Sequence, residues 1–180
     1  MGSSASFLDP QAIASEFGVR KGMQIADFGV GAGHFALELA RLVGDEGKVH
    51  AVDIQQSALE AVRSRARQEG MYNIELVWSD LETPRGSKLA DRSQDIVLLA
   101  NILHQAPDKA AILREARRVT KARGKIIVIE WVGESPMGPD KTSRIPPEAL
   151  LAIAAPLDLE KQGEFSAGAC HYGIIFSPHA

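Results

Sequence analysis

The chain has very little cysteine and no long apolar run. Cys170 is the one cysteine among 180 residues, so an internal disulfide and a cysteine-rich zinc site are both excluded. No apolar run reaches the ~18 residues that a membrane-spanning helix requires. The first residues also lack the charged and apolar regions of a signal peptide. We therefore expect a cytoplasmic protein without a membrane span.

The chain also lacks a strong excess of one charge. Its formal net charge is −3, which gives no bulk attraction to nucleic acid. Arg63, Arg65 and Arg67 are interpreted as the solvated face of a helix, with RNA binding as the minor alternative. The five histidines show no metal-ligand spacing such as His-Glu-x-x-His, so a catalytic metal is not expected.

No internal repeat or second domain is visible in the sequence. A length of 180 residues fits one domain with a single core, and we expect residues 1–180 to form it. Residues 1–20 hold a short helix, capped by Asp9 or Ser6, that either covers the sheet or acts as a lid. The Pro- and Gly-rich loop 133–147 is a second candidate lid.

What the sequence does contain is a glycine turn between an apolar strand and a helix. Residues 23–35 read Met-Gln-Ile-Ala-Asp-Phe-Gly-Val-Gly-Ala-Gly-His-Phe. Gly29, Gly31 and Gly33 let the backbone turn tightly and approach a ligand, because glycine has no Cβ. The helix predicted over residues 35–42 directs its first N–H groups at the same place. This arrangement predicts a nucleotide-sized pocket at the carboxyl end of a sheet.

Three further predicted strands run into polar side chains. The first ends at Asp53, 20 positions after Gly33, where a carboxylate accepts hydrogen bonds from both ribose hydroxyls of an adenosine. Ile54 then offers an apolar surface to the adenine. The next two strands lead into Asp80 and Asn101. These features support the pocket but fit both NAD and S-adenosylmethionine (SAM). The three strands cover residues 48–53, 74–78 and 95–100.

The pattern Asp27-x-Gly29-x-Gly31-x-Gly33 resembles motif I of the class I SAM-dependent methyltransferases. A carboxylate such as Asp27 suits a ligand that carries an ammonium and a sulfonium better than one that carries a pyrophosphate. The dinucleotide fingerprint Gly-x-Gly-x-x-Gly would place its third glycine where this chain has His34. An NAD-dependent oxidoreductase is therefore the less favoured alternative.

The resemblance covers residues 20–132 well and implies a fold. It implies a Rossmann-like three-layer α/β sandwich around a mostly parallel seven-stranded sheet. The implied strand order is 3-2-1-4-5-7-6, with an antiparallel last strand.

The resemblance also implies SAM as the cofactor, S-adenosylhomocysteine as its product, and a set of contact residues. In the family, the residue at the place of Asp80 holds the exocyclic amine of adenine. Asn101 is expected to contact the methionine end of SAM or the acceptor. The implied cofactor-binding residues are Asp27, Gly29, Val30, Gly31, Gly33, Asp53, Ile54, Asp80, Leu81 and Asn101.

The segment Asn101-Ile-Leu-His104-Gln105 resembles the small-molecule branch that includes quinone-biosynthesis C-methyltransferases and arsenite methyltransferases. Arsenite methylation is disfavoured because those enzymes use several cysteine thiols. His104 is the candidate general base, since a histidine changes charge near neutral pH; a structural hydrogen bond is its alternative role. His171 and Tyr172 either line the acceptor pocket or pack within a strand.

We therefore expect a methyltransferase that acts on a small-molecule acceptor. The segment before the first strand is short, so the acceptor side is either wide open or completed by loop 133–147 or by a second subunit of a homodimer. A wide-open site would suit a large substrate or a protein partner. The functional alternative is a non-catalytic SAM-binding module that needs a partner subunit.

The remaining elements are predicted from turn residues and apolar periodicity. Residues 81–94 form either a short helix or a loop. Pro107 is placed in the first turn of a helix, and Ala122–Gly124 in a tight turn before the fifth strand. The predicted helices cover residues 55–68, 107–119 and 147–155, and the last three strands cover residues 125–130, 163–169 and 170–177.

Overall fold

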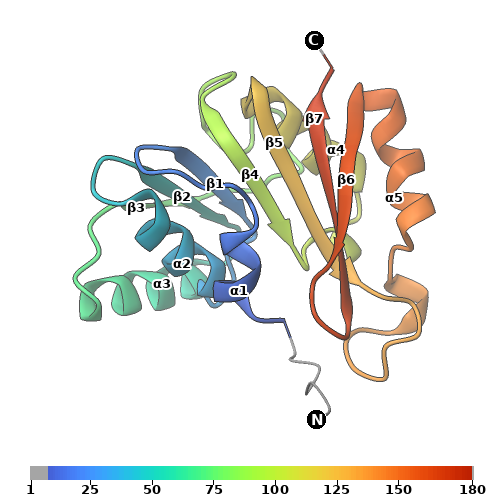
Figure 1. Cartoon of the computed structure of the whole chain (residues 1–180), viewed down its shortest axis with the longest axis horizontal. Helices are drawn as coiled ribbons and strands as arrows, with labels where there is room; N and C mark the ends of the chain where they lie inside the picture. Colours follow the sequence, from blue (N-terminus) through green and yellow to red (C-terminus); the bar gives the residue numbers. More distant parts are fainter. Residues whose placement is uncertain (1–7, 180) are drawn as a thin grey trace.

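A computed structural model describes residues 8–179, and within them a seven-stranded sheet lies between two layers of helices (Figure 1). The strand order is β3-β2-β1-β4-β5-β7-β6. The pairs from β3 through β5 are parallel, whereas β7 is antiparallel to both of its neighbours. The predicted fold class and strand order are thus confirmed. The strands are β1 (Gln24–Phe28), β2 (Lys48–Asp53), β3 (Ile74–Trp78), β4 (Gln94–Ala100), β5 (Thr120–Trp131), β6 (Leu159–Ser166) and β7 (His171–Pro178).

The helices divide between the two faces of the sheet, because side chains alternate along each strand. In β4, Ile96 and Leu98 pack with the apolar residues of α1, α2 and α3, while Val97 and Leu99 pack with those of α4 and α5. None of the helices within residues 8–179 is long and apolar enough to cross a membrane. The helices are α1 (Pro10–Ser15), α2 (His34–Val43), α3 (Gln56–Gln68), α4 (Lys109–Val119) and α5 (Pro147–Ala154), with short 3-10 turns at η1 (Leu103–Gln105), η2 (Lys141–Ser143) and η3 (Ala155–Leu157).

The first and fourth helices begin at aspartate caps. The side chain of Asp9 accepts hydrogen bonds from the backbone N–H groups of Gln11 and Ala12, which confirms one of the two expected caps; Ser6 lies outside the described residues. Asp108 caps α4 by accepting from the N–H of Ala111 at 2.9 Å. The placement of Pro107 in the first turn of α4 is therefore wrong, because the helix starts only after Asp108.

Two other local predictions are wrong. The tight turn expected at Ala122–Gly124 does not precede the fifth strand, since β5 already begins at Thr120, whose backbone pairs with Gln94. The next pair joins Ile96 to Lys125, so the intervening residues of β5 form an irregular bulge. The sixth strand begins at Leu159 rather than residue 163, because its pairing with β7 extends to Pro178. Residues 81–93 contain turns and no helix.

The loop between β5 and α5 is organised by one arginine, Arg144. Its guanidinium donates six hydrogen bonds of 2.8–3.0 Å, all to main-chain carbonyl oxygens of residues 132–139. Gly138 (φ +101°) packs on the ring of Trp131, where an added Cβ would lie 2.5 Å from Cε3. The start of this loop is therefore a folded unit with its own hydrogen bonds. The accepting carbonyls belong to Val132, Gly133, Ser135, Met137 and Pro139.

Candidate functional site

The glycine turn after β1 has three left-handed residues at alternate positions. Gly29, Gly31 and Gly33 have φ angles of +75°, +49° and +78°, a region that side chains other than glycine rarely adopt. A Cβ on Gly33 would lie 2.6 Å from a methyl group of Val62 in α3, whereas a Cβ on Gly31 would meet nothing closer than 4.0 Å. Gly33 thus lets α2 and α3 approach each other, and Gly31 presents bare backbone to open space.

Two residues at the end of β2 hold the glycine turn by hydrogen bonds. The carbonyl of Val52 accepts hydrogen bonds from the N–H groups of Gly29 and Val30 at 2.8 and 3.1 Å. Asp53 accepts from Gly31 N–H through Oδ2 at 2.9 Å and from Gln55 N–H through Oδ1 at 2.8 Å. The side chain of Asp53 is therefore part of the turn that shapes the site, in addition to facing the cavity beside it.

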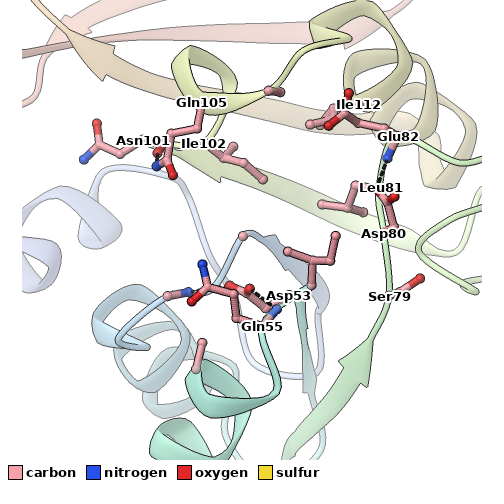
Figure 2. A pocket seen from close by; sticks show the side chains of 15 residues that line it. Asp53, Gln55, Ser79, Asp80, Leu81, Glu82, Asn101, Ile102, Gln105 and Ile112 are labelled. Carbon is pink, nitrogen blue, oxygen red and sulfur yellow. Dashed lines mark hydrogen bonds between the residues drawn. The ribbon is translucent and has the colours of Figure 1, made fainter. Parts of the chain in front are cut away.

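Two cavities adjoin the glycine turn and share Gly29, Gly31, Asn101 and Gln105. The first has a volume of about 310 Å³ and lies between Asp53 and Gln55, the segment that follows β3, and the segment that follows β4 (Figure 2). The second, of about 540 Å³, is bordered by the start of α2 and by Leu8 and Pro10 around the start of α1. Together they form an elongated site along the carboxyl ends of β1, β2, β3 and β4, the place where open α/β sheets bind ligands.

The walls of the smaller cavity carry apolar surface and three acidic residues, Asp53, Asp80 and Glu82. Ile54 is 61% exposed, and its carbonyl accepts a hydrogen bond from the Nε1–H of Trp78 at 3.0 Å. Leu81 also borders this cavity (Figure 2). Asp80 uses Oδ1 to accept from the N–H of Glu82 at 2.9 Å, which fixes its carboxylate beside the cavity.

Asp27, at the wall of the larger cavity, is a buried carboxyl group. It is 2% exposed, and burial raises its pKa from 3.8 to about 7. Burial is the largest cause of this rise, the negative charge of Asp53 contributes to it, and a hydrogen bond from the N–H of Ala36 in α2 opposes it. A cationic group in the cavity would favour the charged form of Asp27.

Asn101, directly after β4, borders both cavities. Its backbone is left-handed (φ +58°), and it is held by hydrogen bonds from its N–H to Ile129 and from Gln105 Nε2 to its carbonyl. The side-chain oxygen of Asn101 is buried and has no hydrogen-bond partner among the described residues. A buried acceptor without a partner is costly, so this atom is available to a ligand donor.

His104 lies beyond these cavities, at the carboxyl end of β5. Its ring Nδ1 is 2.9 Å from Oε2 of Glu130, and its backbone N–H donates to Oε1 of the same carboxylate at 3.2 Å. Glu130 is fully buried. This pair fixes the orientation of the imidazole and leaves Nε2 as the nitrogen not engaged by Glu130.

His171 and Tyr172 border a separate cavity of about 430 Å³ beside β6. His171 is buried against the ring of Trp131, with 4.0 Å between ring centroids, and burial lowers its pKa. The hydroxyl of Tyr172 donates to the carbonyl of Ile145 at 2.6 Å, and burial raises its pKa. Both residues thus take part in strand packing while also bordering a cavity.

All ten predicted cofactor-binding residues border one or both of the first two cavities, and His104 borders neither. Glu130, the partner of His104, is not singled out by the sequence reasoning, although it stands at the end of an apolar run as Asp53 and Asn101 do. Gln105 borders both cavities and is likewise not predicted as a site residue, because its hydrogen bond to Asn101 depends on the η1 turn. Other missed cavity residues include Leu8, Gln55, Ser79, Glu82, Ile102 and Ala106.

The chain is similar in sequence to known proteins. A family described as a methyltransferase domain matches residues 19–153. The ubiquinone/menaquinone biosynthesis C-methyltransferase of a Shewanella species is 35% identical over 115 residues, which cover 63% of this chain and 45% of that protein. The Haemophilus ducreyi protein of the same name is also 35% identical over 115 residues, 63% of this chain and 43% of its own length. The chain thus spans less than half the length of these relatives.

Solved structures resemble this fold over nearly its whole length. A SAM-dependent methyltransferase from Aquifex aeolicus superposes with a TM-score of 0.87 at 25% identity, covering 96% of this chain and 90% of that one. An arsenic(III) SAM methyltransferase from Chlamydomonas reinhardtii superposes with a TM-score of 0.72 at 23% identity, covering 90% and 65%. The second similarity concerns the fold alone.

Proposed function

Because the chain belongs to the methyltransferase domain family, we propose that it binds SAM across the glycine turn and transfers the methyl group to a small-molecule acceptor. The observation that supports this most directly is the pair of adjoining cavities that share Gly29, Gly31 and Asn101. An elongated ligand with a nucleoside at one end and an amino acid at the other matches two cavities on either side of one turn.

The smaller cavity would hold the adenosine. Asp53 would accept hydrogen bonds from the ribose hydroxyls, because each of its oxygens has a second lone pair beyond the one used by Gly31 or Gln55. Ile54 and Leu81 would contact the two faces of the adenine. The Oδ2 atom of Asp80 would accept from the exocyclic amine, while Oδ1 remains bonded to Glu82.

The larger cavity would hold the methionine part. The first N–H groups of α2 suit its carboxylate, since helix N-termini bind anions. Asp27 would attract the cationic groups, and the buried Oδ1 of Asn101 would accept from the ammonium. The open space beside Gly31 leaves room for the chain between the two ends.

SAM, when bound, supplies a methyl group on a sulfonium, which is a good leaving group. This chain would therefore contribute alignment of the acceptor and exclusion of water. His104 is proposed as the base for an acceptor that must release a proton: Glu130 holds its Nδ1, and Nε2 would receive the proton. The names of the curated relatives make a reduced quinone ring that carries hydroxyl groups the first acceptor to assay.

The test is calorimetric titration of the protein with SAM, S-adenosylhomocysteine and NADH. We expect micromolar binding of the first two and none of NADH. Asp53→Ala should weaken SAM binding about 10- to 100-fold, because it removes a charged acceptor worth about 1.5–3 kcal/mol. The matched control is Asp45→Ala, which removes an exposed carboxylate after α2. Failure of the unmodified protein to bind either adenosyl ligand would contradict the proposal.

A further inference from the structure

Arg65 reaches from α3 to the glycine turn of the neighbouring strand–helix unit. Its Nη1 donates a hydrogen bond of 2.7 Å to the carbonyl of Ala32. Nη1 and Nη2 also lie 3.4 and 3.5 Å from Nδ1 of His34. Ala32 and His34 both border the 540 Å³ cavity, whereas Arg65 borders a smaller cavity of about 210 Å³ beside α1 and α2. Arg65 thus touches the back of the site and not its interior.

The contacts of the turn show why this hydrogen bond matters. Residues 29–31 are anchored by Val52 and Asp53 of β2. The following peptide, between Ala32 and Gly33, has its N–H bonded to Val30 at 2.9 Å and its carbonyl bonded to Arg65. Since glycines lose the most conformational freedom on ordering, a turn with three of them requires fixed partners to keep a single shape.

The orientation of this peptide determines what the cavity presents to a ligand. In a trans peptide the C=O and the N–H point in opposite directions. With the Ala32 carbonyl held toward α3, the turn passes into α2, whose first residues, His34 and Phe35, border the 540 Å³ cavity. Rotation of the Ala32–Gly33 peptide would instead bring a carbonyl oxygen toward the place of an anionic ligand group.

We propose that Arg65 is a positioning residue for the cofactor site: it fixes the Ala32–Gly33 peptide so that the start of α2 is preorganised to bind the carboxylate end of the cofactor. This inference rests on the proposed function, because it assumes that the ligand is SAM. The expected role of Arg65 as part of a solvated basic face is thereby replaced by a specific one. Its helix neighbour Arg63 pairs instead with Glu60 on the exposed side.

The experiment compares Arg65→Met, Arg65→Lys and Arg63→Met by calorimetric titration with S-adenosylhomocysteine. Methionine keeps the apolar stem and removes the donor. We expect Arg65→Met to weaken binding about five- to tenfold, since one charge-assisted hydrogen bond that orders the site is lost. Arg65→Lys should recover most of the affinity, because a single Nη1–H donates to Ala32. Arg63→Met should bind like the unmodified protein.

Amide hydrogen exchange of the ligand-free proteins separates positioning from charge alone. Residues 29–36 should exchange faster in Arg65→Met than in Arg63→Met, with equal melting temperatures for the two. Equal affinities of Arg65→Met and Arg63→Met, or lost affinity without faster exchange in the turn, would overturn the inference. If the unmodified protein itself does not bind S-adenosylhomocysteine, it is the proposed function that fails, and faster exchange in Arg65→Met would still show that Arg65 orders the turn.

Discussion

At Asp27, the ionised carboxylate that would favour a bound cationic group is also the form that destabilises the folded protein. The carboxyl group of Asp27 is almost fully buried, so ionisation is unfavourable until a cation arrives. The folded-state pKa of about 7 lies above the value of 3.8 that applies to the unfolded chain. Between these values the folded protein holds more protons than the unfolded one, and stability therefore falls as the pH rises from about 4 to about 7.

The variant Asp27→Asn tests this opposition. At pH 8 we expect its free energy of unfolding to exceed that of the unmodified protein by about 2–4 kcal/mol, since three pKa units correspond to about 4 kcal/mol. At pH 4 the difference should nearly vanish, and urea unfolding at the two pH values measures it. SAM affinity should change in the opposite sense: it should fall in the variant, and in the unmodified protein it should rise as the pH passes 7. A pH-independent stability difference would contradict this account.

At the scale of elements, the packing of α2 against α3 depends on Gly33. The position combines a left-handed backbone with a close approach to Val62, and each feature separately disfavours a side chain.

Gly33→Ala should therefore lower the free energy of unfolding by about 2–4 kcal/mol. Val62→Ala removes the methyl groups that the new Cβ would meet, so the double variant should lose less than the sum of the two single changes. Urea unfolding of all four proteins measures the coupling. Strict additivity would mean that the left-handed backbone, and not the contact with Val62, accounts for the loss.

The elements also show what could be predicted from the sequence. Three strand ends were placed correctly from apolar runs that lead to Asp53, Asp80 and Asn101, because buried parallel strands are near-continuous apolar runs and site residues follow their carboxyl ends. The bulge at the start of β5 was missed, since it arises where Thr120 leaves α4 and pairs at once with Gln94. Contacts between distant residues were also missed, because local sequence patterns do not show them. The hydrogen bonds of Arg65 to Ala32 and of His104 to Glu130 join residues 33 and 26 positions apart in the chain.

At the scale of the whole molecule, the site joins both halves of the sheet. The two cavities are bordered by residues from the segments after β1, β2, β3 and β4, and by Leu8 and Pro10 around the start of α1. A ligand that contacts all of them would add to the links that the sheet and the hydrogen bond from the N–H of Asp108 to Glu82 already make between these segments.

Ligand binding should therefore raise global stability and not only local order. At a concentration 100 times its dissociation constant, S-adenosylhomocysteine should add about 2.7 kcal/mol to the free energy of unfolding. For a domain of this size that corresponds to a rise in melting temperature of about 5–10 °C. Differential scanning calorimetry with NADH as the control ligand measures it. A shift of equal size with NADH would contradict a specific adenosyl site.

The loop of residues 132–139, which Arg144 holds, has a consequence for which of its side chains can change during evolution. Since the arginine binds main-chain carbonyls alone, the shape of residues 132–139 is encoded by groups that every amino acid possesses. Gly138 is restricted by Trp131, and Ser135 by its hydrogen bonds with Met137. Glu134, Pro136 and Met137 are exposed, and among them Glu134 forms a surface ion pair with Lys141. Substitutions at these exposed positions can therefore change the chemistry of the surface while Arg144 keeps the backbone in the same shape. The loop is a suitable position for randomised libraries and for sequence divergence between homologous enzymes.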